Sequence, residues 1–436
     1  MGISVAIVGS GPSGFYAAEA VLERFADAAV DIIDRLPVPY GLIRFGVAPD
    51  HAKTKTVAKS YEAIARDPRV RWLGNIEIGR DVRVPELAAC YDAVVLATGA
   101  ATDRKLGIPG DDKKGVVGVA AFVGWYNGHP DFRDLAPPLD TPSVVVVGVG
   151  NVAVDVARVL VKTPAEMAAT DLAEHAAAAI HAAPIRDVYM VGRRGPVQAR
   201  FTNVELREMG HLKDARPIVD LGQIPETVPA AESQGLTDRD KRLIERNLAT
   251  LRDFAKVDGA GKAKRVHFRF FATPVAVLGG ARVEAVRFEE TVVTGGDAKG
   301  TGRFFEIPCG LVIPAIGYYS EPIPDVPFAK GKTVNDGGRI AKGLYAVGWV
   351  KRGPSGVIGS NKPDGDAAAD RIKADFPDGG AKPGRAAFDR LVSQRGLKPV
   401  DFDGWKKIEA AEVAAARPGA PRRKFTTVAE MLRALG

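Results

Sequence analysis

Two short glycine-rich segments are the parts of this sequence best suited to binding phosphate. Residues 9–14 read Gly-Ser-Gly-Pro-Ser-Gly, and residues 148–153 read Gly-Val-Gly-Asn-Val-Ala. In the G-x-G-x-x-G pattern the first glycine permits a tight turn, the second lets the backbone approach a pyrophosphate, and the third lets a helix pack on a strand. The N–H groups at the start of that helix favour the phosphates. The sequence therefore predicts two dinucleotide sites, with Gly9, Gly11 and Gly14 in the first and Gly150 in the second.

The residues that follow the two segments differ in charge at the position that selects the nucleotide. Asp34 comes twenty residues after Gly14, where a carboxylate accepts hydrogen bonds from free ribose hydroxyls. Arg193 and Arg194 stand at the corresponding place after the second segment, and guanidinium groups match a 2′-phosphate in charge and geometry. We therefore expect FAD in the first site and NADP(H) in the second. The alternative for the arginines is a solvated pair that follows a strand.

The elements that position these segments read as two βαβ units. Residues 3–8 and 30–34 are apolar runs typical of buried strands, and residues 15–28 between them have the apolar spacing of a helix. The second unit repeats this order with strands over 143–147 and 187–191 and a helix from about residue 152. Further strands are predicted over 91–99, 266–277, 282–290, 311–317 and 344–348, and further helices over 165–183, 237–255 and 425–435.

The length fits two or three domains, and the order of the elements suggests that one domain is inserted in another. The chain has 436 residues, against roughly 150 per domain. We expect an α/β protein of glutathione-reductase-like architecture with two Rossmann-like domains. The FAD-binding domain would be discontinuous, over 1–102 and 316–436, and the NADP-binding domain would occupy 103–315. The tail after residue 378 is rich in Pro, Gly and Ala, with one short docked helix near its end.

The composition argues against several classes of protein. The formal net charge is only +7, and no basic run is interleaved with aromatic residues, as nucleic-acid binding would need. Cys90 and Cys309 form no CxxC pair, so we expect neither a sequence-adjacent redox disulfide nor a metal or iron–sulfur centre. No apolar run reaches the length of about 18–20 residues that spans a membrane. The first strand begins at Ile3, so we expect no signal peptide and a location in a bacterial cytoplasm.

Several segments, in order along the chain, resemble the signatures of ferredoxin–NADP reductases of the adrenodoxin-reductase type. Residues 37–51 read Pro-Val-Pro-Tyr-Gly-Leu-Ile-Arg-Phe-Gly-Val-Ala-Pro-Asp-His. Residues 148–158 and 192–208 resemble the NADP motifs of that family, and residues 345–359 resemble its flavin motif. The matches run from residue 3 to about residue 370. The bacterial members of this family are often called FprA-like.

The resemblance implies which residues contact each cofactor. For FAD they are Ser13, Asp34, Leu42, Val82, Trp349, Gly356, Val357 and Ile358. For NADP they are Arg104, Asn151, Val152, Arg193, Arg194, Glu205 and Gly356. Asp34 departs from the family, which usually has Glu there. The shorter acid can still reach a ribose, through a shifted strand end or a bridging water, and the departure bears on FAD affinity rather than on the identity of the cofactor. The Trp349 indole would flank the isoalloxazine ring, and a core tryptophan is the alternative. Residues 356–358 would open a helix aimed at the flavin N1–C2 edge, where its dipole favours negative charge.

The implied reaction moves a hydride from NADPH to the flavin N5 and then single electrons to a ferredoxin, which needs no nucleophile or metal from the protein. His51 and Glu208 lie in family motifs and are the candidates for polar groups beside the nicotinamide. Each would act in a proton relay or orient the carboxamide. The alternatives are a structural histidine and an exposed helix carboxylate.

An acidic ferredoxin or similar iron–sulfur carrier would need a basic docking surface. One predicted helix carries Arg239, Lys241, Arg242 and Arg246 at spacings that place some of them on a common face, although acidic residues interrupt it. The resemblance also implies a monomer. Three other functions stay open: a flavin-dependent oxidase or monooxygenase, an electron-input subunit similar to that of glutamate synthase, and a non-catalytic NADP-sensing or assembly protein.

Overall fold

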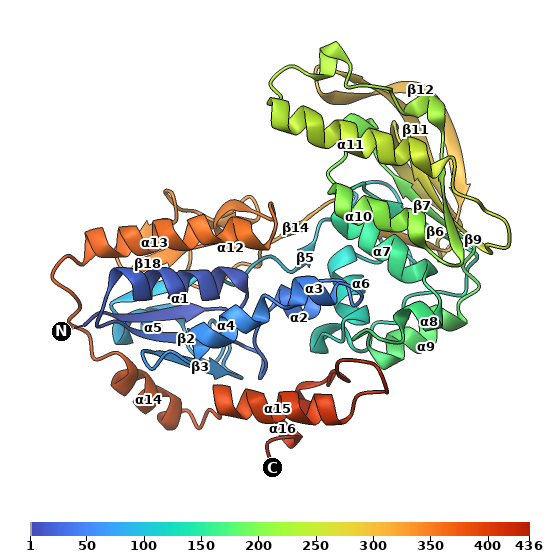
Figure 1. Ribbon diagram of the computed structural model, residues 1–436. Helices are drawn as coiled ribbons and strands as arrows, with labels where there is room; N and C mark the ends of the chain where they lie inside the picture. Colours follow the sequence, from blue (N-terminus) through green and yellow to red (C-terminus); the bar gives the residue numbers. More distant parts are fainter. Residues whose placement is uncertain (1) are drawn as a thin grey trace. The chain divides into compact units, whose positions relative to one another are not determined.

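A computed structural model describes residues 2–436, which form two compact units (Figure 1). Unit 1 comprises the chain up to Thr102, Asn127–Arg133 and Gly317–Gly436, and unit 2 comprises Asp103–Tyr126 and Asp134–Ile316. The segment Asn127–Arg133 differs from the sequence-based division, which places it in the second domain. It belongs to unit 1 because the His129 ring packs on Phe45 with centroids 4.7 Å apart and Lys424 Nζ donates to the Asn127 carbonyl over 3.1 Å.

Unit 1 is built on a seven-stranded sheet in the order β17-β18-β4-β1-β2-β3-β19. Its central strands run parallel, and the side chains of β1 alternate between two hydrophobic cores, Val5 and Ile7 on one face and Ala6 and Val8 on the other. Both faces are therefore buried, which is why these strands are continuous apolar runs. The strands are β1 (Ser4–Val8), β2 (Ala29–Ile33), β3 (Val70–Gly74), β4 (Ala93–Leu96), β17 (Arg339–Ala341), β18 (Leu344–Ala346) and β19 (Val400–Asp401).

Helices cover both faces of this sheet. The helices α1 (Pro12–Arg24) and α13 (Lys362–Asp375) lie side by side on one face (Figure 1), where a Cβ at Gly365 would come within 2.7 Å of the Tyr16 carbonyl oxygen. The other core includes α5 (Val84–Cys90) and α14 (Arg385–Gln394). The remaining elements of unit 1 are α2 (Leu42–Phe45), α3 (Ala52–Lys55), α4 (Ala58–Ala65), α12 (Trp349–Arg352), α15 (Phe402–Ala414), α16 (Val428–Arg433), the short helices η1 (Pro130–Phe132) and η6 (Ile358–Asn361), and strands β14 (Tyr318–Tyr319), β15 (Phe328–Ala329) and β16 (Lys332–Thr333).

The C-terminal tail is more regular than its composition suggests. The tail is rich in Pro, Gly and Ala, and the sequence predicts a single docked helix near its end. The structure contains two further helices, α14 and α15, before α16. Phe388 of α14, together with Trp405 and Ile408 of α15, is fully buried. These apolar side chains stabilise the helices by packing on the sheet, and that contribution cannot be read from local composition.

Unit 2 has a five-stranded parallel sheet in the order β13-β6-β7-β9-β8 and a three-stranded antiparallel sheet, β10-β11-β12. The strands are β6 (Ser143–Val147), β7 (Asp187–Val191), β8 (Ala215–Val219), β9 (Lys264–Arg269), β10 (Ala272–Leu278), β11 (Ala285–Thr294), β12 (Asp297–Pro308) and β13 (Leu311–Pro314), after the short β5 (Thr102–Asp103). The helices are α6 (Val119–Tyr126), α7 (Asn151–Val161), α8 (Pro164–Met167), α9 (Glu174–Ala182), α10 (Asn203–Glu208) and α11 (Asp238–Phe254), with short helices η2 (Pro196–Gln198), η3 (Met209–His211), η4 (Leu221–Gln223) and η5 (Ala230–Glu232).

Three elements of unit 2 differ from the sequence-based expectation. The strand predicted over 266–277 is divided into β9 and β10, because Phe271 adopts φ +56° and turns the chain between them. The helix predicted over 165–183 is two helices, α8 and α9, and the Thr170 hydroxyl donates to the Met167 carbonyl where the first one ends. The strand β12 is absent from the prediction, because its alternation of exposed and half-buried residues is weak.

Each unit contains a parallel strand, a glycine turn and a helix in that order, which confirms the predicted α/β fold with two Rossmann-like units. Over residues 2–436, the model contains no helix whose length and hydropathy would let it cross a bilayer.

Candidate functional site

The first glycine turn joins β1 to α1 and leaves the start of α1 open. Gly9 has φ +108°, and a Cβ there would lie 2.5 Å from the Ala97 carbonyl oxygen, while a Cβ at Gly14 would overlap the Gly9 carbonyl oxygen. At Gly11, by contrast, the nearest heavy atom to a Cβ would be Gly41 Cα, 4.0 Å away. Gly11 is the N-cap of α1, and no side chain among residues 2–436 caps this helix. The first and third glycines thus serve protein packing, and the second leaves backbone N–H groups accessible to a phosphate.

Asp34 follows β2 directly and is fixed against this turn. Its Oδ2 accepts from the Ser10 backbone N–H over 2.8 Å and from the Ser10 hydroxyl over 2.6 Å, and its Oδ1 accepts from the Leu36 N–H over 3.0 Å. Ser10 is fully buried, and sequence reasoning missed it although it stands between two glycines of the turn. A carboxylate has about four lone-pair sites, so the same group can also accept from a ribose.

The predicted flavin contacts on other elements of unit 1 differ in how they are presented. Leu42 opens α2 and is 43% exposed, whereas Val82 is fully buried. Ser13 Oγ donates to Asn361 Oδ1 over 3.0 Å and so ties α1 to the start of α13. The half-buried Trp349 stacks on Tyr318, with ring centroids 5.8 Å apart and planes 18° apart, and its indole N–H donates to the Ser355 carbonyl.

The segment after Trp349 leads into a helical run. Val357 is 63% exposed and is the N-cap of η6, which starts at Ile358 and continues directly into α13. Arg352 fixes the start of the loop over 353–357, because its guanidinium donates to Asp364 Oδ2 over 2.9 Å and to Asn361 Oδ1 over 3.1 Å. Gly356 and its neighbours therefore stand at the beginning of a helix, where backbone N–H groups are available to a ligand.

The second glycine turn joins β6 to α7 and has the same design. A Cβ at Gly148 would overlap the Ala315 carbonyl oxygen, whereas a Cβ at Gly150 would have no heavy atom within 4 Å. Gly150 is the N-cap of α7, a helix that no side chain of the described chain caps. Asn151, the first residue of α7, uses its Oδ1 to accept from the Thr202 N–H over 2.7 Å. Asn151 thus orients the loop before α10, and the helix start itself offers the N–H groups.

Three arginines gather beside this turn. Arg193 and Arg194 follow β7, and Arg194 Nη1 donates to the Gly296 carbonyl over 3.2 Å. The pKa of Arg194 is lowered first by desolvation and then by repulsion from Arg193 and Arg200. Arg200 also donates its backbone N–H to the Val149 carbonyl of the turn. Neighbouring cations stabilise a bound anion, which fits a phosphate monoester. Arg200 was missed from sequence, although it lies within eight residues of the predicted pair.

A buried arginine joins α7 to α10. The Arg158 side chain is 0% exposed, with Nη2 2.8 Å from Asp155 Oδ1, Nε 3.3 Å from Glu208 Oε2 and Nη1 3.9 Å from Glu205 Oε2. Glu205 and Glu208 are both sequence-predicted site residues, and this cluster brings them together on one face of α10. Glu208 is therefore more than a solvated carboxylate. Sequence reasoning gave Arg158 no role, although it stands three residues after Asp155 on one helix face.

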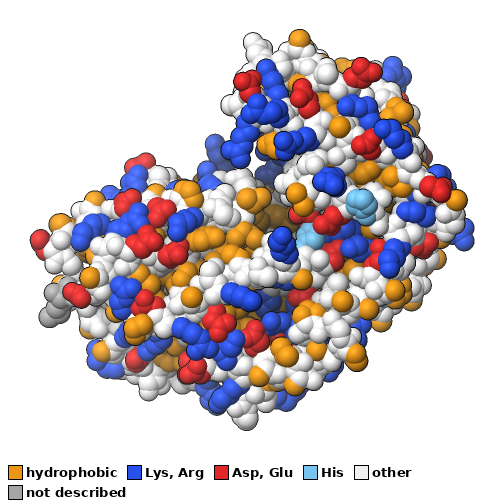
Figure 2. All heavy atoms as spheres, viewed as in Figure 1, with side chains coloured by type: hydrophobic (Ala, Val, Ile, Leu, Met, Phe, Trp, Pro, Cys, Tyr) orange, Lys and Arg blue, Asp and Glu red, His pale blue; other side chains and the backbone are white. Residues whose placement is uncertain are grey.

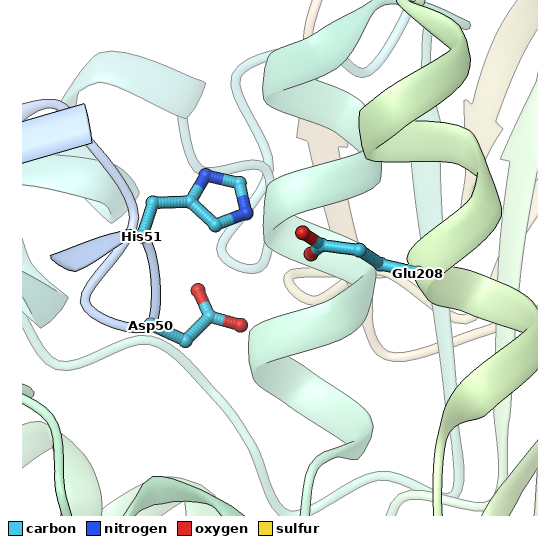
Figure 3. Close-up of side chains that lie close together, drawn as sticks. All are labelled: Asp50, His51 and Glu208. Atoms are coloured by element: carbon cyan, nitrogen blue, oxygen red, sulfur yellow. The ribbon is translucent and has the colours of Figure 1, made fainter. Parts of the chain in front are cut away.

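The two predicted catalytic residues lie on different units. His51 is half-buried and is the N-cap of α3 in unit 1, and Glu208 ends α10 in unit 2 with its side chain 37% exposed (Figure 3). Arg104, the remaining predicted NADP contact, is exposed just after β5. Each unit therefore presents one polar candidate, His51 before α3 and Glu208 at the end of α10.

The helix α11 carries the predicted docking surface. Thr237 caps this helix, and its inner face carries the buried side chains of Leu248, Leu251 and Phe254. Lys and Arg side chains gather over one end of this helix (Figure 2). Of the predicted residues Arg239, Lys241, Arg242 and Arg246, all are exposed except Lys241, which is half-buried. Three of the four cations thus face solvent at spacings of three and four residues, on one helix face.

Comparisons with known proteins identify relatives of this arrangement. A family model for pyridine nucleotide-disulphide oxidoreductases matches residues 3–210. The chain is 42% identical over 460 residues to the mitochondrial NADPH:adrenodoxin oxidoreductase of Mus musculus, covering 99% of this chain and 91% of the relative. It is 41% identical over 458 residues to the NADPH-ferredoxin reductase FprA of Mycobacterium tuberculosis, covering 98% of both.

Solved structures of relatives also match this chain over its whole length. A structure of FprA, a Mycobacterium tuberculosis oxidoreductase, superposes on this chain with a TM-score of 0.92 at 40% identity over 100% of both chains. A structure of Mycobacterium tuberculosis FprA in complex with NADPH gives the same TM-score at 39% identity. Because the similarity extends over the full length of both proteins, this chain belongs to the family of flavoprotein oxidoreductases that contains NADPH:adrenodoxin oxidoreductase and NADPH-ferredoxin reductase FprA.

Proposed function

We propose that this protein is an FAD-dependent NADPH–ferredoxin reductase. The observation that carries the proposal is the pair of uncapped helix starts, α1 beside Asp34 and α7 beside three arginines. The full-length relatives are an NADPH:adrenodoxin oxidoreductase and an NADPH-ferredoxin reductase, which supports the same pair of substrates here.

FAD would be held by unit 1. The N–H groups of Gly11 and Ser13 would bind its pyrophosphate, in a turn that Gly9 and Gly14 shape through their packing, and Asp34 would accept from its ribose. Val82, which is fully buried, is a further proposed FAD contact. Leu42, Trp349 and residues 356–358 would surround the isoalloxazine ring, with the start of η6 favouring negative charge at its pyrimidine edge.

NADPH would be held by unit 2. The start of α7, with Gly150, Asn151 and Val152, would bind the pyrophosphate through backbone N–H groups. Arg193 and Arg194 would bind the 2′-phosphate with their guanidinium forks, and Arg200 adds a third positive charge. Glu205, Arg104 and Gly356 would complete the contacts.

The residues of this chain would bind and orient the two nucleotides and exclude water from the reacting atoms. FAD held by the turn at residues 9–14, Asp34 and Trp349 would supply the redox chemistry that links a two-electron donor to a one-electron acceptor. Glu208 is proposed to accept a hydrogen bond from the nicotinamide carboxamide, and His51 to hold or relay a proton beside the nicotinamide. Holding the donor carbon against the acceptor nitrogen in one orientation is the main contribution of such a site to the rate.

The acidic iron–sulfur carrier would dock on the exposed cations of α11, Arg239, Arg242 and Arg246, with Lys241 at their edge. Opposite charge on the two partners raises the association rate and sets the orientation. We further propose that the protein is a monomer in a bacterial cytoplasm, as FprA of Mycobacterium tuberculosis is a bacterial relative. Size-exclusion chromatography should then give a mass near 46.2 kDa.

Nucleotide preference tests the assignment of the two sites. The holoenzyme is mixed anaerobically with increasing NADPH or NADH while flavin bleaching is followed. Arg194→Ala should raise the Kd for NADPH by about tenfold to a hundredfold and leave NADH unchanged, because a hydrogen bond between charged groups contributes about 1.5–3 kcal/mol. Arg287→Ala, which removes an exposed arginine paired with Glu306, is the matched control. Equal reduction by NADPH and NADH in the wild type would contradict the assignment.

A further inference from the structure

Arg158, a buried cation of unit 2, is not among the proposed cofactor contacts. Arg158 lies on the third turn of α7, the helix whose first residues form the proposed pyrophosphate cradle. Its side chain is completely buried, and its guanidinium nitrogens lie 2.8 Å from Asp155, 3.3 Å from Glu208 and 3.9 Å from Glu205. Asp155 belongs to the same helix, whereas both glutamates belong to α10.

This arrangement joins one buried positive charge to three carboxylates. The carboxylate side chains are 14%, 21% and 37% exposed for Asp155, Glu205 and Glu208, so each is partly accessible from the surface while its partner is not. A guanidinium has five N–H donors in a fixed planar fork, and it can therefore hold several carboxylates at once in defined orientations. Lysine, with a compact charge on a flexible stem, does this less well.

Glu205 and Glu208 are three residues apart on α10 and so share one face of that helix. Glu208 has been proposed as the acceptor for the nicotinamide carboxamide, and Glu205 as a further contact of the same nucleotide. A carboxylate that engages Arg158 through one oxygen still has lone pairs for a ligand donor such as a carboxamide N–H. The arginine thereby removes rotational freedom from the glutamates without itself reaching the ligand.

We propose that Arg158 is a positioning residue, which acts through Glu205 and Glu208 to fix the acceptor geometry for the nicotinamide half of NADPH. The proposal rests on the proposed function, because it concerns the same nucleotide. It also explains why an arginine is buried at this place, where a hydrophobic side chain would pack α7 against α10 at lower cost in desolvation.

The test is a double-mutant cycle in the holoenzyme with Arg158→Met, Glu208→Gln and the two combined. Two readouts are taken for each: the limiting rate of anaerobic flavin reduction at saturating NADPH, and the Kd of NADP⁺ from calorimetry. Arg269→Met, which replaces an arginine stacked on Phe305 elsewhere in unit 2, is the control. Thermal unfolding and the flavin absorption spectrum report whether each variant is folded and loaded.

Each single variant should lower the limiting rate at least about fivefold, and the combined variant should fall little further, because residues that act through one another are not additive. Arg158→Met should also raise the NADP⁺ Kd at least about fivefold, and Arg269→Met should change neither readout more than about twofold. Arg158→Lys keeps the charge and should change both readouts in the same direction by a smaller factor. This variant decides the matter if Arg158→Met does not fold.

A purely structural role would lower the melting temperature of the folded Arg158 variants while rate and Kd stay within about twofold of the wild type, and that result would overturn the proposal. Additive losses in the cycle would overturn it as well. If NADPH fails to reduce the wild-type flavin at all, the proposed function fails instead, so the two failures are distinguishable.

Discussion

The ion pair between Arg44 and Glu412 allows a quantitative test of how α15 stabilises α2, the helix that carries the proposed FAD contact Leu42. Arg44 lies on α2, two residues after Leu42, and Glu412 lies on α15. Their side chains are 4% and 0% exposed, and Arg44 Nη1 donates to Glu412 Oε2 over 3.0 Å. Glu412 Oε1 also accepts from the Phe425 N–H over 2.7 Å, and Lys424 Nζ donates to the Arg44 carbonyl over 3.0 Å.

Glu412→Gln removes the negative charge and leaves the hydrogen bond from Phe425 in place. The Arg44 cation then stays buried without its counter-charge, and breaking a buried pair in this way costs about 3–5 kcal/mol of unfolding free energy. Glu19→Gln is the matched control, since Glu19 pairs with Lys362 over 2.8 Å in the same unit but the two side chains are 35% and 49% exposed. An exposed pair contributes at most about 1 kcal/mol, so the control should change little.

A second variant separates the charge effect from packing. Arg44→Met combined with Glu412→Gln removes both buried charges of the pair, while Arg422, 3.5 Å from Glu412, keeps Glu409 as a partner over 3.0 Å, so the combined variant should recover a large part of the loss of the single variant. Recovery will be incomplete, because Arg44 also stacks over Phe45 and Trp405 at 5.1 and 5.3 Å from their ring centroids.

Urea unfolding of the holoenzyme, followed by flavin and tryptophan fluorescence, measures these differences from the shift of the midpoint at constant slope. Because FAD is proposed to bind unit 1, its release should report the unfolding of that unit, and Glu412→Gln should release it at a lower urea concentration than Glu19→Gln. Unfolding free energies of the two single variants that agree within about 1 kcal/mol, or a combined variant as unstable as Glu412→Gln alone, would show that the buried ion pair does not stabilise α2.

Three further outcomes follow from the structure. Arg242→Glu on α11 should lower ferredoxin-dependent kcat/KM about tenfold at low salt. The difference should vanish near 1 M salt, where charges are screened beyond about 3 Å. Lys299→Glu on β12 makes the same change of net charge and is the control, and an equal effect of this variant on kcat/KM would exclude α11 as the docking surface. Burial raises the pKa of the Cys309 thiol to about 12, so a thiol reagent at neutral pH should label this residue only after unfolding, and rapid labelling of the native protein would contradict its protonated, inaccessible state. Burial lowers the pKa of His129, so the unfolded chain binds this proton more readily and stability should fall as the pH drops below about 6.5. His129→Gln should flatten that loss in urea midpoints measured across this range, and an unchanged slope would show that another group is responsible.

The glycine turns and their strands are predictable because short-range sequence determines them. A buried parallel strand must be a continuous apolar run, and a tight turn with φ +108° at Gly9 or +139° at Gly148 requires glycine. Asp34 after β2 and Arg193 and Arg194 after β7 are predictable for the same reason, because they follow the second strand of each βαβ unit.

What the sequence did not reveal depends on tertiary partners. Arg158 looks like one more helix arginine until α10 brings Glu205 and Glu208 against it. Ser10 gains its role only when Asp34 folds back onto the turn. The helices α14 and α15 have unremarkable local composition, and they become stable where Phe388 and Trp405 enter the core of unit 1.

We propose that this one chain passes electrons from NADPH through a flavin to an iron–sulfur carrier. Anaerobic mixing of the purified protein with NADPH, and with NADH in a second sample, followed by oxidised ferredoxin, tests this electron path. We expect rapid flavin bleaching by NADPH over NADH, and recovery of the flavin band when ferredoxin is added. Bleaching that ferredoxin does not reverse but oxygen does would contradict this electron path and would indicate an oxidase or monooxygenase.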